Sequence, residues 1–74
     1  MKLETSCRLN YATTKAKLNE FNVVMDQAHE ILRGGENGKA YYRLGQAYHH
    51  FKKYDRSLKN LEKAVKMLPD DVIG

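Results

Sequence analysis

The chain has 74 residues, 13 Lys or Arg, nine Asp or Glu and a formal net charge of +4. A chain of this length forms one small domain with a thin core, its single cysteine excludes an intrachain disulfide, and it lacks an apolar run near the ~20 residues that span a bilayer. We therefore expect a reduced, cytoplasmic protein without a membrane span or signal peptide, whose charge favours an acidic partner only weakly.

Residues 5–37 are predicted to form two helices. Ala12 and Leu18 mark the buried side of the first helix. The second helix is expected to end at Gly34-Gly35, because glycine commonly ends a helix. It carries apolar residues at helical spacing, namely Phe21, Met25, Ala28, Ile31 and Leu32.

Residues 38–71 are predicted to form a second pair of helices. Along the third helix, apolar or small residues recur at i, i+3, i+4 and i+7, as in an amphipathic helix: Tyr41, Leu44, Gly45 and Tyr48. Lys52-Lys53 interrupts this pattern. The fourth helix starts near Tyr54, and Pro69 stops it because proline disfavours a helical conformation at the residue before it. Its apolar residues are Leu58, Leu61, Ala64, Val65 and Leu68.

The two halves repeat each other at an offset of 33 residues. The offset aligns Ala12 with Gly45, and six further pairs that are apolar on both sides. Small residues at this position allow two helices to approach closely, whereas large residues fill the space near each turn. We therefore expect a common core that includes Ala12, Gly45, Tyr48, Phe51 and Tyr54, and we expect Cys7 to be a buried or half-buried thiol.

The run Tyr41-x2-Leu44-Gly45-x2-Tyr48 resembles the signature of the tetratricopeptide repeat, with Tyr in place of Trp. The resemblance implies an all-α fold, an antiparallel helix-turn-helix array of two repeats. The repeats are residues 5–37 and 38–71, and together they form a single partial domain, 1–74. In this fold the first helix of each repeat lines a concave surface. The implied groove residues are Ser6, Leu9, Asn10, Thr13, Ala16 and Lys17 in the first repeat, and Lys39, Tyr42, Arg43, Gln46, His49 and His50 in the second.

This set of groove residues contains no Asp or Glu. Lys17, Lys39 and Arg43 supply positive charge, and the residues between them supply hydroxyl, amide and imidazole groups. A groove rich in donors suits a peptide that brings carboxylates. Arg43 can hold a carboxylate with two parallel hydrogen bonds, and Lys39 adds a point charge one turn away.

Two short runs resemble the large immunophilin prolyl isomerases and related co-chaperones. Arg8-Leu-Asn-Tyr-Ala12 is similar to a His-Leu-Asn-Leu-Ala run of that family, and Lys39-Ala-Tyr-Tyr-Arg43-x-Gly-Gln-Ala47 is similar to Lys-Ala-x-x-Arg-x-Gly-x-Ala. The family holds the Glu-Glu-Val-Asp tail of heat-shock proteins 90 and 70 in a five-residue carboxylate clamp, whose other two positions, a Lys and an Asn, belong to a further repeat. The resemblance implies that Asn10, Lys39 and Arg43 are clamp residues, and that a parent protein carries a separate prolyl-isomerase domain. Lys17, Thr13, Gln46 and His50 are expected to be secondary peptide contacts.

The sequence leaves one alternative open, namely that the array is a structural scaffold that self-associates or binds a partner other than a chaperone. This alternative is based on the outer faces of the terminal helices, which are expected to expose apolar residues such as Leu61, Val65 and Leu68. Nucleic-acid binding is not expected, since most tyrosines occupy predicted core positions. No cofactor, metal or catalytic activity is predicted: His49 and His50 diverge on a helix, and no pair of carboxylates is placed for acid–base chemistry.

Overall fold

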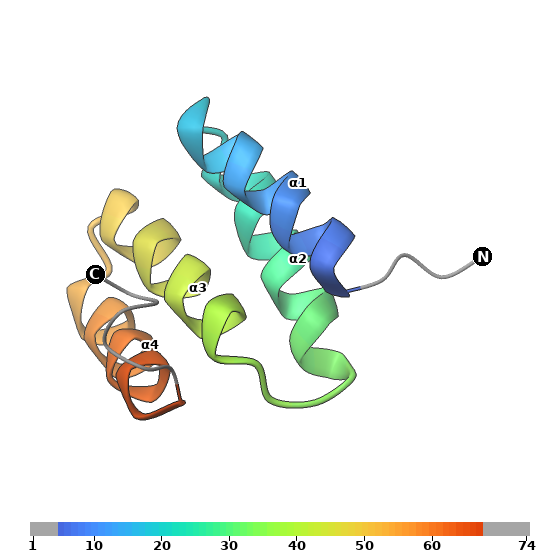
Figure 1. The fold of residues 1–74 in the computed structure, drawn as a ribbon. Helices are drawn as coiled ribbons and strands as arrows, with labels where there is room; N and C mark the ends of the chain where they lie inside the picture. The colour runs from blue at the N-terminus through green and yellow to red at the C-terminus, as the bar shows by residue number, and fades with distance from the viewer. Residues whose placement is uncertain (1–4, 68–74) are drawn as a thin grey trace.

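The computed structural model describes residues 5–67, with side chains from residue 7 onward. They form four helices (Figure 1): α1 (Thr5–Lys17), α2 (Phe21–Arg33), α3 (Gly38–His50) and α4 (Tyr54–Met67). The prediction of an all-α array of helical hairpins is confirmed. None of these helices is long and apolar enough to cross a membrane. The predicted stop at Pro69 lies outside the described residues.

The turns within the two hairpins have the same backbone geometry. Asn19 and Lys52 both have a positive φ, 61° and 64°, and they are 33 residues apart. At the same offset, the amide of Glu20 donates to the carbonyl of Lys15 at 2.9 Å, and that of Lys53 donates to the carbonyl of Tyr48 at 2.8 Å. The repeat found in the sequence is therefore also a repeat of turn conformation.

The connection between the hairpins is set by glycine and asparagine. The helix α2 ends at Arg33, where Gly34 donates to the carbonyl of Ile31, and Gly35 then adopts a φ of 140° that a side chain would resist. Asn37 caps α3, since its Oδ1 accepts a hydrogen bond from the amide of Ala40 at 3.1 Å. The predicted end of the second helix at the glycine pair is confirmed.

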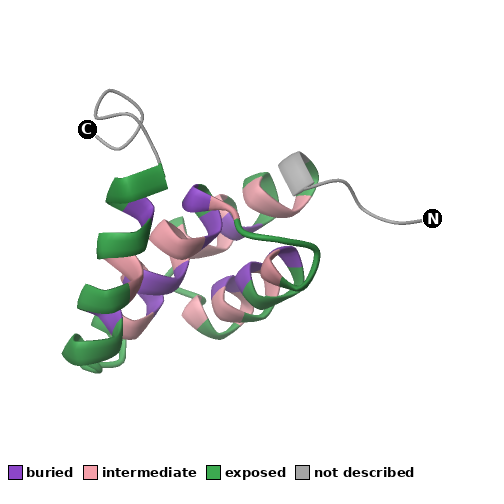
Figure 2. Ribbon diagram, turned by 90° about the horizontal axis from the view of Figure 1, so that it is seen from below, coloured by how far each residue is buried: buried purple, intermediate pink, exposed green. Residues whose placement is uncertain are grey.

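The helix α3 lies at the centre of the molecule. It packs against α4 on one side and against α2, with fewer contacts to α1, on the other (Figure 1). The core lies on the faces that the helices turn toward one another, whereas the outer side of α4 is exposed (Figure 2). One cluster joins α2 to α3 through Ala28, Ile31, Ala40 and Leu44, and another joins α1, α2 and α3 through Ala12, Val24 and Ala47.

The helices α3 and α4 approach each other closely at Gly45. A methyl group on Gly45 would lie 2.6 Å from Cγ and Cδ2 of Leu61, and the hydroxyl of Ser57 donates to the carbonyl of Gly45 at 2.8 Å. Ala12 is fully buried at the equivalent position. The expectation that these two positions require small residues is confirmed.

The predicted core is too large at the turns of both hairpins. Tyr48 is half-buried, but Phe51 and Tyr54 are 37% and 57% exposed, so their assignment to the core is wrong. Leu18, the counterpart of Phe51 just after α1, is 59% exposed and does not mark a buried side either. Phe21, the counterpart of Tyr54, is half-buried because His50 of α3 stacks on its ring at 4.5 Å. Within residues 5–67, no helix stands in that place for Tyr54.

Cys7 is exposed, which contradicts the prediction of a buried or half-buried thiol. The helix α1 turns Ala12, which is fully buried, toward α2 and α3. Cys7 precedes Ala12 by five residues, which on a helix places the two side chains about 140° apart around the axis. Cys7 therefore faces away from the packed side.

Candidate functional site

Arg43 joins the two helices that were expected to line the groove. Its Nη2 donates to Thr13 Oγ1 of α1 at 2.9 Å, and its Nη1 donates to Gln46 Oε1 at 2.7 Å. The hydroxyl of Thr13 in turn donates to the carbonyl of Leu9 at 2.8 Å, which fixes its orientation. The structure thus brings together Arg43, Thr13 and Gln46, which are three of the predicted site residues.

The partners of Arg43 in this network are neutral. Both acceptors, a hydroxyl and an amide oxygen, leave the positive charge of the guanidinium uncompensated, and among the described residues no carboxylate forms an ion pair with it. The guanidinium lies 5.4 Å from the centre of the Tyr42 ring and the side chain is half-buried. Arg43 has five N–H donors, so donors remain for a further acceptor.

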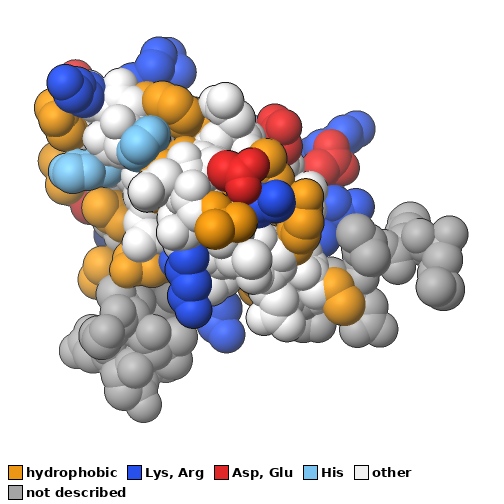
Figure 3. All heavy atoms as spheres, turned by 90° about the horizontal axis from the view of Figure 1, so that it is seen from above, with side chains coloured by type: hydrophobic (Ala, Val, Ile, Leu, Met, Phe, Trp, Pro, Cys, Tyr) orange, Lys and Arg blue, Asp and Glu red, His pale blue; other side chains and the backbone are white. Residues whose placement is uncertain are grey.

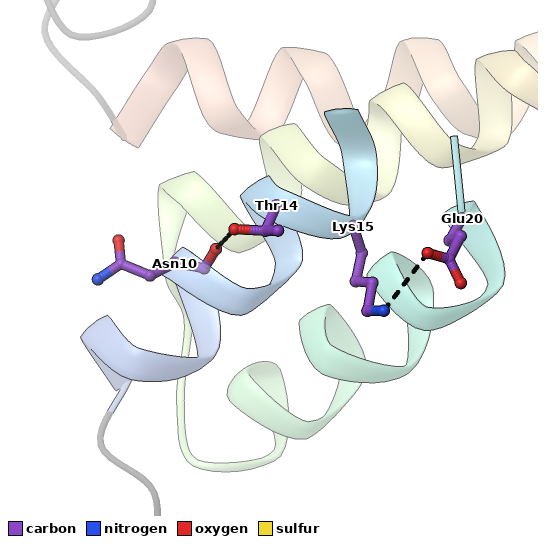
Figure 4. Close-up of polar contacts among 4 residues, drawn as sticks. All are labelled: Asn10, Thr14, Lys15 and Glu20. Atoms are coloured by element: carbon purple, nitrogen blue, oxygen red, sulfur yellow. Dashed lines mark hydrogen bonds and ion pairs between the residues drawn. The ribbon is translucent and has the colours of Figure 1, made fainter. Parts of the chain in front are cut away.

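Lys39 and Asn10 lie near this network but outside it. Lys39 is exposed one turn before Arg43 on α3, and Asn10 is exposed one turn before Thr13 on α1. The backbone carbonyl of Asn10 accepts from Thr14 Oγ1 at 3.1 Å, whereas its side-chain amide extends away from the helix (Figure 4). Lys17 is exposed at the end of α1. The structure places these three polar groups on the same two helices, with no mutual contact.

The ion pair formed by α1 includes none of these residues. Lys15 of α1 forms an ion pair of 3.3 Å with Glu20, just before α2, and its Nζ lies 5.5 Å from the centre of the Tyr11 ring. Figure 4 shows this pair on a different side of α1 from the Asn10 side chain. The carboxylate of Glu20 is therefore engaged by Lys15, on the side of α1 that faces the start of α2.

A pocket lies at the end of α3 and shares Gln46 with the Arg43 network. The pocket has a volume of about 430 Å³. Residues of α3 line most of it, namely Tyr42, Gly45, Gln46, His49 and His50, and Asn19, Phe21 and Leu61 come from other elements. Gln46 belongs both to this pocket and to the Arg43 network, so the two are continuous. Figure 3 looks onto this end of the molecule, where imidazole groups lie beside apolar side chains.

Sequence reasoning found the α3 side of this pocket and missed the rest. Asn19 comes from the α1–α2 turn, Phe21 from the start of α2, and Leu61 from α4. Only the first helix of each repeat was expected to line the groove, so no sequence pattern gave these three residues a role in the pocket.

The two adjacent histidines have separate partners. The ring of His50 stacks on Phe21 at 4.5 Å, and that of His49 meets Tyr54 edge-on at 5.3 Å. Between residues 5 and 67, no three His, Cys, Asp or Glu side chains gather in a way that would hold a metal ion. What the site offers is therefore hydrogen-bond donors, positive charge and aromatic surface.

Two of the comparisons with known proteins give matches. Residues 38–71 match the model of the tetratricopeptide repeat family. Among curated proteins, the chain is similar to peptidyl-prolyl cis-trans isomerase D of Eremothecium gossypii, with 36% identity over 73 residues. That match covers 93% of this chain and 20% of the relative, so the chain spans about a fifth of that protein's length. No solved structure matches.

Proposed function

We propose that this chain is a protein-interaction module whose groove binds the acidic C-terminal peptide of heat-shock protein 90 or 70. The tetratricopeptide repeat in its all-α array supports a binding role, because helical repeats of this kind form extended binding surfaces. The observation that carries this proposal is Arg43, a half-buried cation held in place by two neutral acceptors. Such a group is oriented before the ligand arrives, which lowers the ordering cost of binding.

Each proposed contact follows from the position of its residue. Arg43 holds a peptide carboxylate with its remaining donors, and Lys39 adds charge one turn away. Asn10 binds the terminal carboxylate or the peptide backbone with its free amide. Lys17, Thr13, Gln46 and His50 are secondary contacts: Thr13 and Gln46 act by orienting Arg43, and Gln46 and His50 line the pocket that receives an apolar side chain of the peptide.

The first half of the chain completes this groove as a divergent repeat. We propose that residues 5–37 form one repeat and residues 38–71 another. The shared turn conformation at Asn19 and Lys52 supports this division, as does the 33-residue offset between Ala12 and Gly45 at equivalent close packing positions.

The magnitude of the interaction is limited by the number of charged contacts. A hydrogen bond to a charged group contributes ~1.5–3 kcal/mol, so Lys39 and Arg43 together give ~3–6 kcal/mol before ordering costs. Micromolar affinity needs ~8 kcal/mol. We therefore expect the 74-residue chain alone to bind such a peptide more weakly than micromolar, with further groups of a longer protein supplying the rest.

A paired substitution tests the groove. Lys39→Ala with Arg43→Ala removes both cations, and we expect loss of peptide binding at unchanged helicity, because Lys39 is exposed and the partners of Arg43 can bond to water. The measurement is a titration with a peptide ending in Glu-Glu-Val-Asp, followed by the amide resonances of α1 and α3 in NMR spectra.

The matched control is Arg56→Ala with Lys63→Ala. It removes the same two residue types from α4, where each cation lies over a tyrosine ring, at 5.9 Å and 5.1 Å. Binding should be retained in this control. If both pairs weaken binding equally, only net charge matters and the proposed groove is wrong.

A further inference from the structure

The outer side of α4 carries an apolar stripe. Tyr54, Leu58, Leu61 and Val65 recur at i, i+4, i+7 and i+11. Tyr54, Leu58 and Val65 are 57%, 59% and 55% exposed, and Figure 2 shows the exposed outer surface of this helix. A shallow hollow of about 310 Å³ is lined by Leu58, Leu61, Glu62, Val65 and Lys66. The first four of these stand at i, i+3, i+4 and i+7, the arrangement that receives a side chain from a facing helix.

The repeat shows that this kind of face packs against another helix. At the 33-residue offset, the counterparts of Leu58, Leu61 and Val65 are Met25, Ala28 and Leu32 of α2. All three belong to the cluster that packs α2 against Ala40 and Leu44 of α3. Within residues 5–67, no helix covers the equivalent face of α4.

The charges beside the stripe indicate which helix fits. Asp55, Lys59, Glu62 and Lys66 form a row at i, i+4, i+7 and i+11 in which the sign alternates. None of the four takes part in an ion pair among the described residues. When two copies of α4 lie antiparallel about a two-fold axis, this row faces itself: Asp55 lies opposite Lys66 of the other copy, and Lys59 opposite Glu62. In a parallel arrangement, the row on one copy faces the opposite flank of α4 on the other copy. The row then does not pair with itself.

We propose that α4 is a homodimerisation surface, on which two copies of this chain pack antiparallel through their α4 helices. In this register Leu58 of one copy faces Leu61 of the other and enters the hollow on the α4 helix of that copy. The contact is isologous, so each hollow is filled once and the assembly closes at two copies. The surface contains none of the residues of the Arg43–Thr13 network and shares Leu61 with the lining of the pocket at the end of α3, and it adds a function beyond peptide binding.

Sedimentation equilibrium over a wide range of concentrations tests the dimer. Wild-type protein should pass from monomer to dimer, and Leu58→Gln with Val65→Gln should remain monomeric. The control, Arg56→Gln with Lys63→Gln, places the same two new residues on α4 away from the stripe and should dimerise like the wild type. All of these side chains are outside the core, so circular dichroism should show equal helicity. A wild type that stays monomeric at every concentration overturns the proposal.

Charge exchange tests the register. Asp55→Lys with Glu62→Lys makes the row wholly basic, and Lys59→Glu with Lys66→Glu makes it wholly acidic. Each variant alone should be monomeric because like charges face each other, and an equimolar mixture should restore dimerisation. Dimerisation of each variant alone to the wild-type extent, or a mixture that stays monomeric, contradicts antiparallel α4 pairing.

Discussion

Lys15 of α1 and Arg43 of α3 are both cations, but they differ in the charge of their partners. Lys15 is paired with Glu20 and lies beside Tyr11, so its charge is largely compensated. Arg43 bonds to Thr13 and Gln46, which orient it and leave its charge unbalanced. Both are basic residues on the first helix of a hairpin, and only the second is suited to hold an anionic ligand.

Gly45 carries the clearest stability prediction for a single residue. Gly45→Ala places a methyl group 2.6 Å from two side-chain atoms of Leu61 and 3.3 Å from the carbonyl oxygen of Ser57. Overpacking costs about 1–3 kcal/mol, against about 1 kcal/mol that alanine gains over glycine in a helix. We expect a net decrease in the free energy of unfolding, measured by urea denaturation.

Leu61→Ala provides the control for this effect. With the leucine side chain removed, Gly45→Ala meets only the Ser57 carbonyl, so its cost should fall by at least about 1 kcal/mol relative to the Leu61 background. The same cost of Gly45→Ala in both backgrounds would show that the Gly45–Leu61 contact is not what restricts this position.

At the scale of elements, α3 carries most of the functional geometry. One side receives α4 at Gly45, another packs on α2 through Ala40 and Leu44, and the side with Lys39, Arg43 and Gln46 is the one we propose to line the groove. The residues of its groove face can be positioned only if the helix starts in the correct register. Its start is fixed by the side chain of Asn37.

Removal of the Asn37 cap should lower the stability of the folded chain. Asn37→Ala deletes the hydrogen bond to the amide of Ala40, and loss of such an N-cap costs about 0.5–2 kcal/mol. Asn22→Ala is the control, because Asn22 is an exposed asparagine in the first turn of α2 and alanine is favoured within a helix. Thermal unfolding followed by circular dichroism should show a lower midpoint for Asn37→Ala alone. Equal midpoints would mean that the cap does not set the start of α3.

For the whole molecule, the sequence predicted the helices, their order and the close approach at Gly45, because these depend on local spacing and on small residues. It overestimated burial at Phe51 and Tyr54, since burial there depends on a neighbouring helix that apolar periodicity within one helix does not reveal. Thr13, Arg43 and Gln46 were expected on one surface, but the hydrogen bonds between them depend on side-chain conformations. Phe21 of α2 and Leu61 of α4 line the pocket, although neither helix was expected to contribute to the groove.

The central claim is that the groove recognises carboxylates, and an NMR titration tests it most directly. The wild-type chain is titrated with a peptide ending in Glu-Glu-Val-Asp, and with the same peptide bearing a C-terminal amide. Asn10, Lys39 and Arg43 have no carboxylate partner among the described residues, so the free acid should bind more tightly and shift the resonances of α1 and α3. Loss of one charge-assisted hydrogen bond, ~1.5–3 kcal/mol, corresponds to roughly a tenfold or greater loss of affinity for the amide. Equal affinity for the two peptides would contradict carboxylate recognition.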